Sequence, residues 1–383
     1  MTRERLYAPG PVPVPPQVLA ALAQPVVHHR SQGFRELFLS VRSRLAEVFA
    51  VPGDDVVVLT GSGTAGFEAA LLACVGPGEK VLCLRSGRFG ERWVDVSRRF
   101  GLEVTQFVAD YGTEYELDAL GSQLEELPDV AAVIVVHSET STGMLHDVER
   151  IARVVRETAR DALVIVDAVS SLAAAELRPR EWDLDVVVSG SQKGVMVPPG
   201  LAFAWLSTRA VAREGGRAPT YYLDLRTEIE RQREGQTGST PATSLIAALD
   251  VSLDLILERG IEQRWQLKER LNRSLLAAGT AVGLRRFASR PSPAVAALAT
   301  PEGVDASRIV SALREDGIYV GGGQGDLKER ILRPSLLGHT DQHDLVVLSA
   351  GLEVAARRVG LKPQPGVAVA AASEAWHEAA SGR

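Results

Sequence analysis

A glycine-rich turn follows a strongly apolar run near the N-terminus and could bind a phosphate group. Residues 56–60 read Val-Val-Val-Leu-Thr, and the chain continues Gly61-Ser62-Gly63-Thr64-Ala65-Gly66. The pattern predicts a buried strand, a tight turn and a helix starting near Thr64, whose free N–H groups would attract phosphate. The spacing also satisfies the dinucleotide-binding fingerprint, but the next predicted strand, residues 80–84, ends in Arg85-Ser86 instead of an acidic residue. NAD is therefore disfavoured, whereas NADP stays possible because an arginine can meet a ribose phosphate.

A carboxylate and a lysine each follow a buried strand further along the chain. Asp167 ends the apolar run of residues 163–167, where open α/β sheets place their ligands. Taken alone, it could equally be a metal ligand, a helix cap or a catalytic acid. Lys193 follows the predicted strand 185–189 with its apolar centre Val186-Val187-Val188, and its small neighbours leave space around the amine. Lysine is normally a solvated surface residue, but a desolvated lysine near other cations has a lowered pKa and readily forms a Schiff base.

Together the three segments meet the needs of one cofactor, pyridoxal 5'-phosphate (PLP). PLP requires an anchor for its phosphate, an acid beside its pyridine nitrogen and a lysine for its aldehyde. A dehydrogenase needs only the first of these. The combination predicts a PLP enzyme in which Lys193 forms the Schiff base and Asp167 pairs with the pyridine nitrogen.

These segments resemble those of the class V aminotransferases of PLP fold type I, in particular the alanine–glyoxylate, serine–glyoxylate and serine–pyruvate branch. The resemblance runs from Pro9-Gly10-Pro11 to about Leu361. Besides the segments above, it is carried by His137-Ser138-Glu139-Thr140-Ser141-Thr142-Gly143, by Gly321-Gly322-Gly323-Gln324-Gly325 and by Arg333. It implies an enzyme that moves an amino group from a small amino acid (alanine, serine or aspartate) to glyoxylate or pyruvate by a ping-pong mechanism.

The resemblance also implies a role for individual residues. Lys193 would carry a proton between the substrate Cα and the cofactor C4′. Arg333 would clamp the carboxylate that both substrates share, and His29 would read the substrate side chain. Thr240 would reach the phosphate of a neighbouring subunit, which implies a homodimer whose active sites are shared across the interface. The other implied cofactor contacts are Ser62, Gly63, Thr64 and Gln192 at the phosphate, Phe89 and Val169 on the two ring faces, and Thr140 at the phenolic oxygen.

Two positions depart from the family pattern, and three other functions stay open. Phe89 stands where some relatives carry tryptophan, and Pro334 after Arg333 removes one backbone donor. The alternatives are a PLP-dependent lyase on the same fold, an NADP-dependent oxidoreductase and a non-catalytic relative. A cysteine desulfurase needs a cysteine in a late mobile loop, whereas Cys74 and Cys83 both come early. Both fall in predicted buried elements, so free thiols are expected rather than a disulfide.

The elements that must position these residues alternate between apolar strands and amphipathic helices. Alternation of this kind predicts an α/β fold with a mostly parallel seven-stranded sheet. The strands are expected at residues 56–60, 80–84, 103–107, 132–137, 163–167, 185–189 and 202–206. The domains are predicted as an extended, proline-rich arm at 1–16, a large PLP-binding domain at 17–255, a smaller C-terminal α+β domain at 256–361 and a disordered tail at 362–383.

The overall composition is that of an ordinary globular enzyme. The chain has 383 residues, of which 45% are hydrophobic and 23% charged, and a net charge of −6 with no Lys/Arg-rich block. Nucleic acid and anionic membranes are therefore not expected as partners. No clustered ligand set suggests a metal. The N-terminus lacks the apolar stretch of a secretory signal, so a cytoplasmic enzyme is expected.

Overall fold

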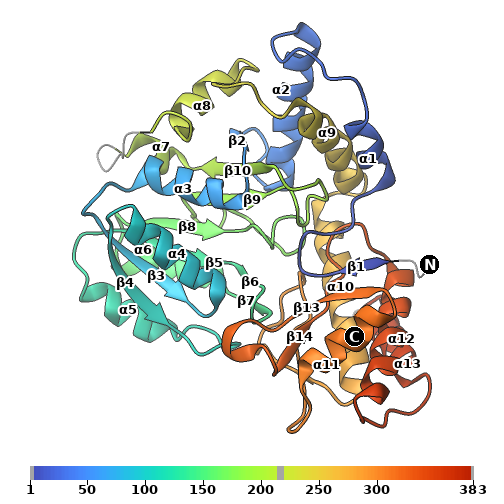
Figure 1. The fold of residues 1–383 in the computed structure, drawn as a ribbon. Coiled ribbons are helices and arrows are strands. Elements are labelled where there is room, and N and C mark those ends of the chain that lie inside the picture. Colours follow the sequence, from blue (N-terminus) through green and yellow to red (C-terminus); the bar gives the residue numbers. More distant parts are fainter. Residues whose placement is uncertain (1–3, 214–219, 381–383) are drawn as a thin grey trace.

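A seven-stranded sheet forms the centre of the large domain (Figure 1). The computed structural model describes residues 4–213 and 220–380, so residues 1–3 of the predicted arm and 381–383 of the predicted tail lie outside the described residues. The sheet has the order β2-β10-β9-β8-β5-β3-β4, and only β10 runs antiparallel to its neighbours. The prediction of a mostly parallel seven-stranded sheet is therefore confirmed. The strands are β2 (Val56–Thr60), β3 (Lys80–Arg85), β4 (Glu103–Val108), β5 (Val130–Val136), β8 (Leu163–Asp167), β9 (Val186–Gly190) and β10 (Leu201–Leu206).

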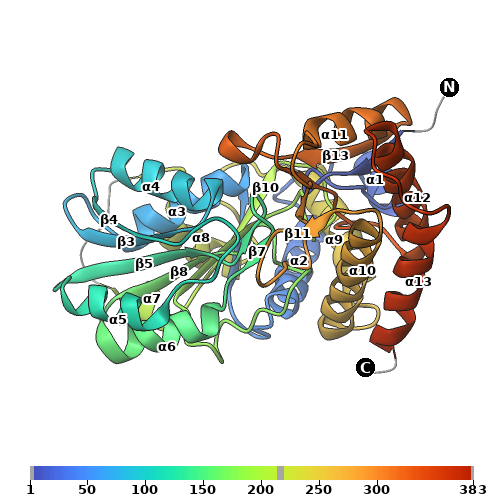
Figure 2. The same cartoon turned by 90° about the horizontal axis from the view of Figure 1, so that it is seen from below.

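Helices cover both faces of this sheet (Figure 2). Successive strand residues point to opposite faces, so Val57 packs in the apolar cluster beneath α3 and α4, whereas Val56 packs in the one beneath α2. The helices of the large domain are α1 (Pro16–Leu22), α2 (Gln32–Val48), α3 (Gly63–Cys74), α4 (Arg88–Arg99), α5 (Leu117–Glu125), α6 (Val148–Thr158), α7 (Thr208–Ala212), α8 (Leu225–Arg233) and α9 (Thr243–Leu257). A short hairpin of β6 (Ser138–Glu139) and β7 (Met144–Leu145) follows β5. No helix in the described ranges is long and apolar enough to cross a membrane.

The small domain is built on a second sheet, of order β1-β13-β14-β12-β11, with helices packed against it. Its edge strand β1 comes from the N-terminus and pairs in parallel with β13. The predicted arm is thus anchored in the small domain before it runs across to α1 in the large domain. The elements are β1 (Arg5–Tyr7), α10 (Ile261–Ala281), β11 (Arg285–Arg286), β12 (Leu298–Ala299), α11 (Ala306–Glu315), β13 (Ile318–Gly322), a 3-10 turn at Gly325–Leu327, β14 (Ile331–Arg333), α12 (Gln342–Arg358) and α13 (Val367–Ala380).

The C-terminal segment differs from the prediction of a disordered tail. Residues 367–380 form helix α13, which packs against α10 and α12. Ala368 and Ala372 are buried in the small-domain core, and the Arg270 guanidinium lies 3.7 Å from the centroid of the Trp376 ring. Within residues 362–380, glycine and proline occur only at 363–366, whereas the alanines that follow favour a helix. The composition of the tail therefore gave a wrong prediction, because the buried residues of α13 are small and do not form an obvious apolar pattern.

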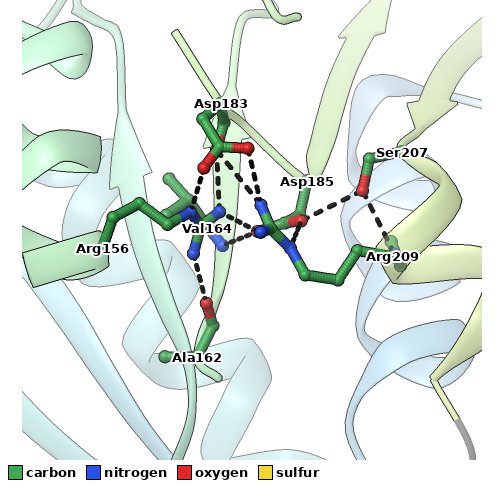
Figure 3. Close-up of polar contacts among 8 residues, drawn as sticks. Arg156, Ala162, Val164, Asp183, Asp185, Ser207 and Arg209 are labelled. Carbon is green, nitrogen blue, oxygen red and sulfur yellow. Dashed lines mark hydrogen bonds and ion pairs between the residues drawn. The ribbon is translucent and has the colours of Figure 1, made fainter. Parts of the chain in front are cut away.

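A buried carboxylate aligns the three strands that lead to the site residues (Figure 3). Asp185 precedes β9 and is fully buried. Its carboxylate accepts hydrogen bonds from Val164 N at 2.7 Å and from Ser207 Oγ at 3.0 Å, and it pairs with Arg156 and Arg209. Val164 belongs to β8 and Ser207 follows β10, so one side chain ties β8, β9 and β10 at their common end.

Candidate active site

Asp167 and Lys193 lie at the same edge of the large sheet. Asp167 is the last residue of β8, and β8 pairs in parallel with β9, Asp167 standing opposite Val188. Lys193 follows the end of β9 by three residues, in a turn closed by a hydrogen bond from Met196 N to Lys193 O. Gly194 is required there, because a Cβ on it would lie 2.1 Å from the carbonyl oxygen of Leu172. The lysine turn is therefore packed against the segment that follows Asp167.

The Lys193 side chain is half-buried and its amine is turned toward the N-terminal arm. Its Nζ donates a hydrogen bond of 2.7 Å to the carbonyl oxygen of Pro9, in the N-terminal arm. Burial lowers the pKa of Lys193 to about 8, and the neighbouring Arg333 lowers it as well, while Asp167 acts in the opposite direction. The neutral, nucleophilic form of the amine is therefore more abundant at neutral pH than it is for an exposed lysine.

The Asp167 carboxylate is buried and held in a fixed orientation. Its Oδ1 accepts a hydrogen bond from Val169 N at 2.9 Å, and its Oδ2 accepts one from Trp93 Nε1 at 3.2 Å. Burial raises the pKa of Asp167 to about 6, although both hydrogen bonds oppose this shift. A cationic group placed against this carboxylate would restore its charged form.

The glycine turn, Val169 and Gln192 meet at the start of α3. A Cβ built on Gly63 would lie 2.9 Å from Val169 Cγ2, and one built on Gly190 would lie 2.9 Å from Gln192 Oε1 and 3.4 Å from the Gly63 backbone. The N–H groups of Gly63 and Thr64 open α3, where they have no acceptor in the described part of the chain. The neighbouring Ser62 hydroxyl is exposed. These donors form a small basin suited to an anion.

Arg333 reaches the site from the small domain. It ends β14 and is buried, with Nε donating to Gly322 O and one terminal nitrogen donating to Thr140 O, both at 2.8 Å. Burial lowers the pKa of Arg333 to about 10, so the guanidinium stays charged at neutral pH. The two carbonyls orient the guanidinium, and its other terminal nitrogen has no acceptor among the described residues. That nitrogen is free to bind a carboxylate.

The remaining predicted residues divide into two groups. Phe89, in the first turn of α4, packs against the same apolar cluster as Val169. No contact within the described ranges joins His29 or Thr240 to Lys193, Asp167 or Arg333. His29 lies between α1 and α2 with its ring centroid 5.1 Å from that of His28, and Thr240 is exposed before α9. One chain therefore assembles every predicted site residue except these two.

Two contacts of the site were not predicted from the sequence. No role was predicted for Trp93, yet its indole N–H donates a hydrogen bond to Asp167. The Pro9 carbonyl was not considered, yet it accepts from Lys193. Trp93 lies four residues after Phe89 and so on the same face of the helix, which could have indicated that it faces the site as well. Nothing local to Pro9 indicates a partner 184 positions away.

The polar groups of the site match the phosphate, the pyridine nitrogen and the aldehyde of PLP. Gln192 Oε1 is buried without a hydrogen-bond partner among the described residues, which marks the basin at α3 as a place where a further polar group belongs. An amide side chain can turn its NH2 toward a phosphate oxygen. Gln192, Gly63 and Thr64 would hold the phosphate, Asp167 the pyridine nitrogen and Lys193 the aldehyde carbon.

This combination of sheet order, strand-end carboxylate and desolvated lysine defines a type I transferase fold. A profile of the family "Aminotransferase class-V" matches residues 6–346, and the chain belongs to this family. It is 37% identical over 378 residues to the "Soluble hydrogenase 42 kDa subunit" of Anabaena cylindrica, covering 97% of this chain and 98% of that protein. It is 33% identical over 382 residues to the L-aspartate–glyoxylate aminotransferase of Paracoccus denitrificans, covering 97% and 96%.

A solved structure supports the same assignment. The aspartate aminotransferase of subgroup IV from Thermus thermophilus superposes on the chain with a TM-score of 0.87 at 38% identity, covering 93% of this chain and 100% of that one. The predicted fold class and the predicted family are confirmed.

Proposed function

We propose that this aminotransferase uses PLP to move an amino group from alanine, serine or aspartate to glyoxylate or pyruvate. The observation that carries the proposal is the half-buried Lys193 amine, with its lowered pKa, at the same end of the sheet as the carboxylate of Asp167. The name of the Paracoccus denitrificans relative, an L-aspartate–glyoxylate aminotransferase, supports the substrate class. Other relatives named serine–glyoxylate aminotransferases, such as that of Methylorubrum extorquens, support it as well.

Each site residue has a task in this reaction. When bound, PLP supplies an electron-withdrawing ring that stabilises negative charge at the substrate Cα. Asp167 keeps a proton on the ring nitrogen, and Lys193 removes the proton from the substrate Cα. Arg333 would bind the α-carboxylate of donor and acceptor in turn, and Phe89 and Val169 would hold the ring between them. In the homodimer proposed below, His29 would contact the substrate side chain.

A cysteine desulfurase on this fold is a poorer proposal, because the chain lacks a suitable thiol to accept the sulfur. Cys74 and Cys83 are both buried and free, as predicted from their positions. Burial raises the pKa of each thiol to about 12. Neither side chain can present a thiolate to a substrate at neutral pH.

The active enzyme is proposed to be a homodimer with active sites shared across the interface. Thr240 is exposed in the single chain, as it must be to reach the phosphate of a neighbouring subunit. Large apolar side chains are exposed on α1, on α2 and on the loop between them, which also carries His29. A second copy of the chain would cover them. These side chains are Leu19, Val26, Val27 and Leu39.

The amine of Lys193 predicts how cofactor uptake depends on pH. Only the neutral amine attacks an aldehyde, so the rate at which PLP combines with cofactor-free protein should rise about tenfold per pH unit below about pH 8. Above that pH the rate should level off. The measurement is the growth of the visible Schiff-base absorption in a stopped-flow series, with Nα-acetyllysine as the control for an ordinary amine. A plateau reached only near pH 10 would show that Lys193 is not desolvated.

A half-reaction assay tests the proposed function. The PLP-loaded protein is mixed separately with alanine, serine and aspartate, and loss of the visible band is followed together with the oxo acid formed. Glyoxylate or pyruvate should then restore the band. Release of ammonia without loss of the band would indicate a lyase, and oxidation that depends on NADP would indicate an oxidoreductase.

A further inference from the structure

Helix α4 carries Phe89 but has no cap of its own. Its N-cap residue is Gly87, which offers no side chain, so the first N–H groups of the helix need acceptors from elsewhere. The N–H groups of Phe89 and Gly90 both donate to Glu139 Oε2, at 3.0 and 3.1 Å, and that of Arg88 donates to Ser141 Oγ at 3.0 Å. The segment that bears Thr140 therefore caps the helix that bears Phe89.

The Glu139 carboxylate is packed closely between the start of α4 and Ser141. Glu139 is fully buried. Its Oε1 accepts from Ser141 N at 3.1 Å and from Ser141 Oγ at 2.5 Å. A Cβ on Gly87 would lie 2.5 Å from both Glu139 Cδ and Ser141 Oγ, so only glycine fits opposite.

Only the ionised carboxylate suits this set of partners. Three of its four hydrogen bonds come from backbone N–H groups, which cannot accept a proton in return. Burial raises the pKa of Glu139, while its hydrogen bonds and the positive end of the helix dipole favour the charged form. A glutamine at this position would turn its NH2 toward N–H donors in either orientation of the amide.

Glu139 also stands between the charged groups of the site. Burial lowers the pKa of Arg333 and the charge of Glu139 opposes this shift, whereas the same charge adds to the raising of the pKa of Asp167 by burial. Glu139 is adjacent in sequence to Thr140, whose carbonyl accepts from Arg333 at 2.8 Å. Glu139 is thus linked to Phe89, to Thr140 and to Arg333.

We propose that Glu139 is a positioning residue of the active site, which holds Phe89 and Thr140 in place around the cofactor and keeps Arg333 oriented for substrate carboxylate. The inference rests on the proposed function, because it concerns the same site. Glu139 does not touch the reacting atoms. Its loss should weaken cofactor binding and substrate binding together, which loss of a merely structural contact would not do.

A glutamate elsewhere in the chain provides a matched control. Glu353, on α12, accepts from Gly366 N at 2.9 Å and from Ala368 N at 3.2 Å, and so caps α13 from a different segment, as Glu139 caps α4. It is 9% exposed and lies in the small domain. Glu353→Gln should lower the melting temperature of the protein without affecting cofactor or substrate.

The experiment compares wild type, Glu139→Gln and Glu353→Gln in three measurements. These are the PLP dissociation constant from titration of cofactor-free protein, the KM of donor and acceptor, and the melting temperature of the cofactor-free form. Glu139→Gln should raise the PLP dissociation constant and both KM values by about tenfold each, because bonds to a charged group are lost. Glu353→Gln should leave all three constants within about twofold of wild type.

The outcomes separate this inference from the proposed function. A Glu139→Gln protein that differs from wild type only in melting temperature, as Glu353→Gln does, would overturn the positioning role. If Glu139→Gln does not fold, Ser141→Ala replaces it, with an expected rise of about threefold in the same constants and the same overturning result. A wild-type protein that fails to bind PLP would instead refute the proposed function.

Discussion

Replacing Lys193 with alanine should lower turnover by about four orders of magnitude while leaving the fold intact. The variant loses both the amine that binds the cofactor aldehyde and the base that moves the Cα proton. Its fold should survive, because the only hydrogen bond of the amine within the described ranges is to Pro9 O. The measurements are steady-state turnover with the best donor, circular dichroism and thermal unfolding.

Two comparisons sharpen the Lys193 experiment. Lys328 is exposed, and Lys328→Ala should keep full activity. Added ethylamine should restore a small part of the activity of Lys193→Ala, because a free amine can replace the missing base. Near-normal turnover in Lys193→Ala would refute the assignment of the Schiff-base lysine.

Replacing Arg333 with alanine should raise the KM of donor and acceptor alike, by about 100-fold each. The two substrates share only the carboxylate, and one charge-assisted pair of hydrogen bonds contributes about 3 kcal/mol, or roughly two factors of ten. Turnover at saturating substrate should fall less. Initial rates over a grid of donor and acceptor concentrations give both constants.

The structure offers controls for the Arg333 variant as well. Arg330 is exposed three residues earlier on the same segment, and Arg330→Ala should leave both constants unchanged. Arg333→Lys keeps the charge but not the planar fork, so its constants should be intermediate. A change confined to one substrate would show that the clamp has been assigned to the wrong residue.

The large domain was predictable because its signals are local. The apolar runs that became β2 and β8 stop at Thr60 and Asp167, as predicted, since polar residues end each run. Asp167 ends β8 and Lys193 follows the end of its parallel neighbour β9, and parallel strands bring their carboxyl ends to the same side of a sheet. The family motifs added Arg333, which periodicity alone would not have singled out.

The features that were missed depend on contacts between distant segments. The tail helix α13 is stabilised by Glu353 and Arg270, which lie outside it, and its own residues are small and weakly patterned. Strand β1 forms because β13 offers an edge more than 300 residues away. Glu139 likewise caps α4 from about 50 residues away in the sequence, so no local pattern predicts the contact. His29 and Thr240 were predicted from the family resemblance, but no contact in the described part of the single chain joins them to the site. Their predicted roles involve the substrate and a second subunit.

Reductive trapping tests the central claim most directly. The protein is incubated with PLP, reduced with borohydride, digested and mapped by mass spectrometry. The phosphopyridoxyl group should appear on Lys193 alone, and the protein should be yellow before reduction. A colourless protein, or a label spread over exposed lysines such as Lys328 with Lys193 unmodified, would contradict the account.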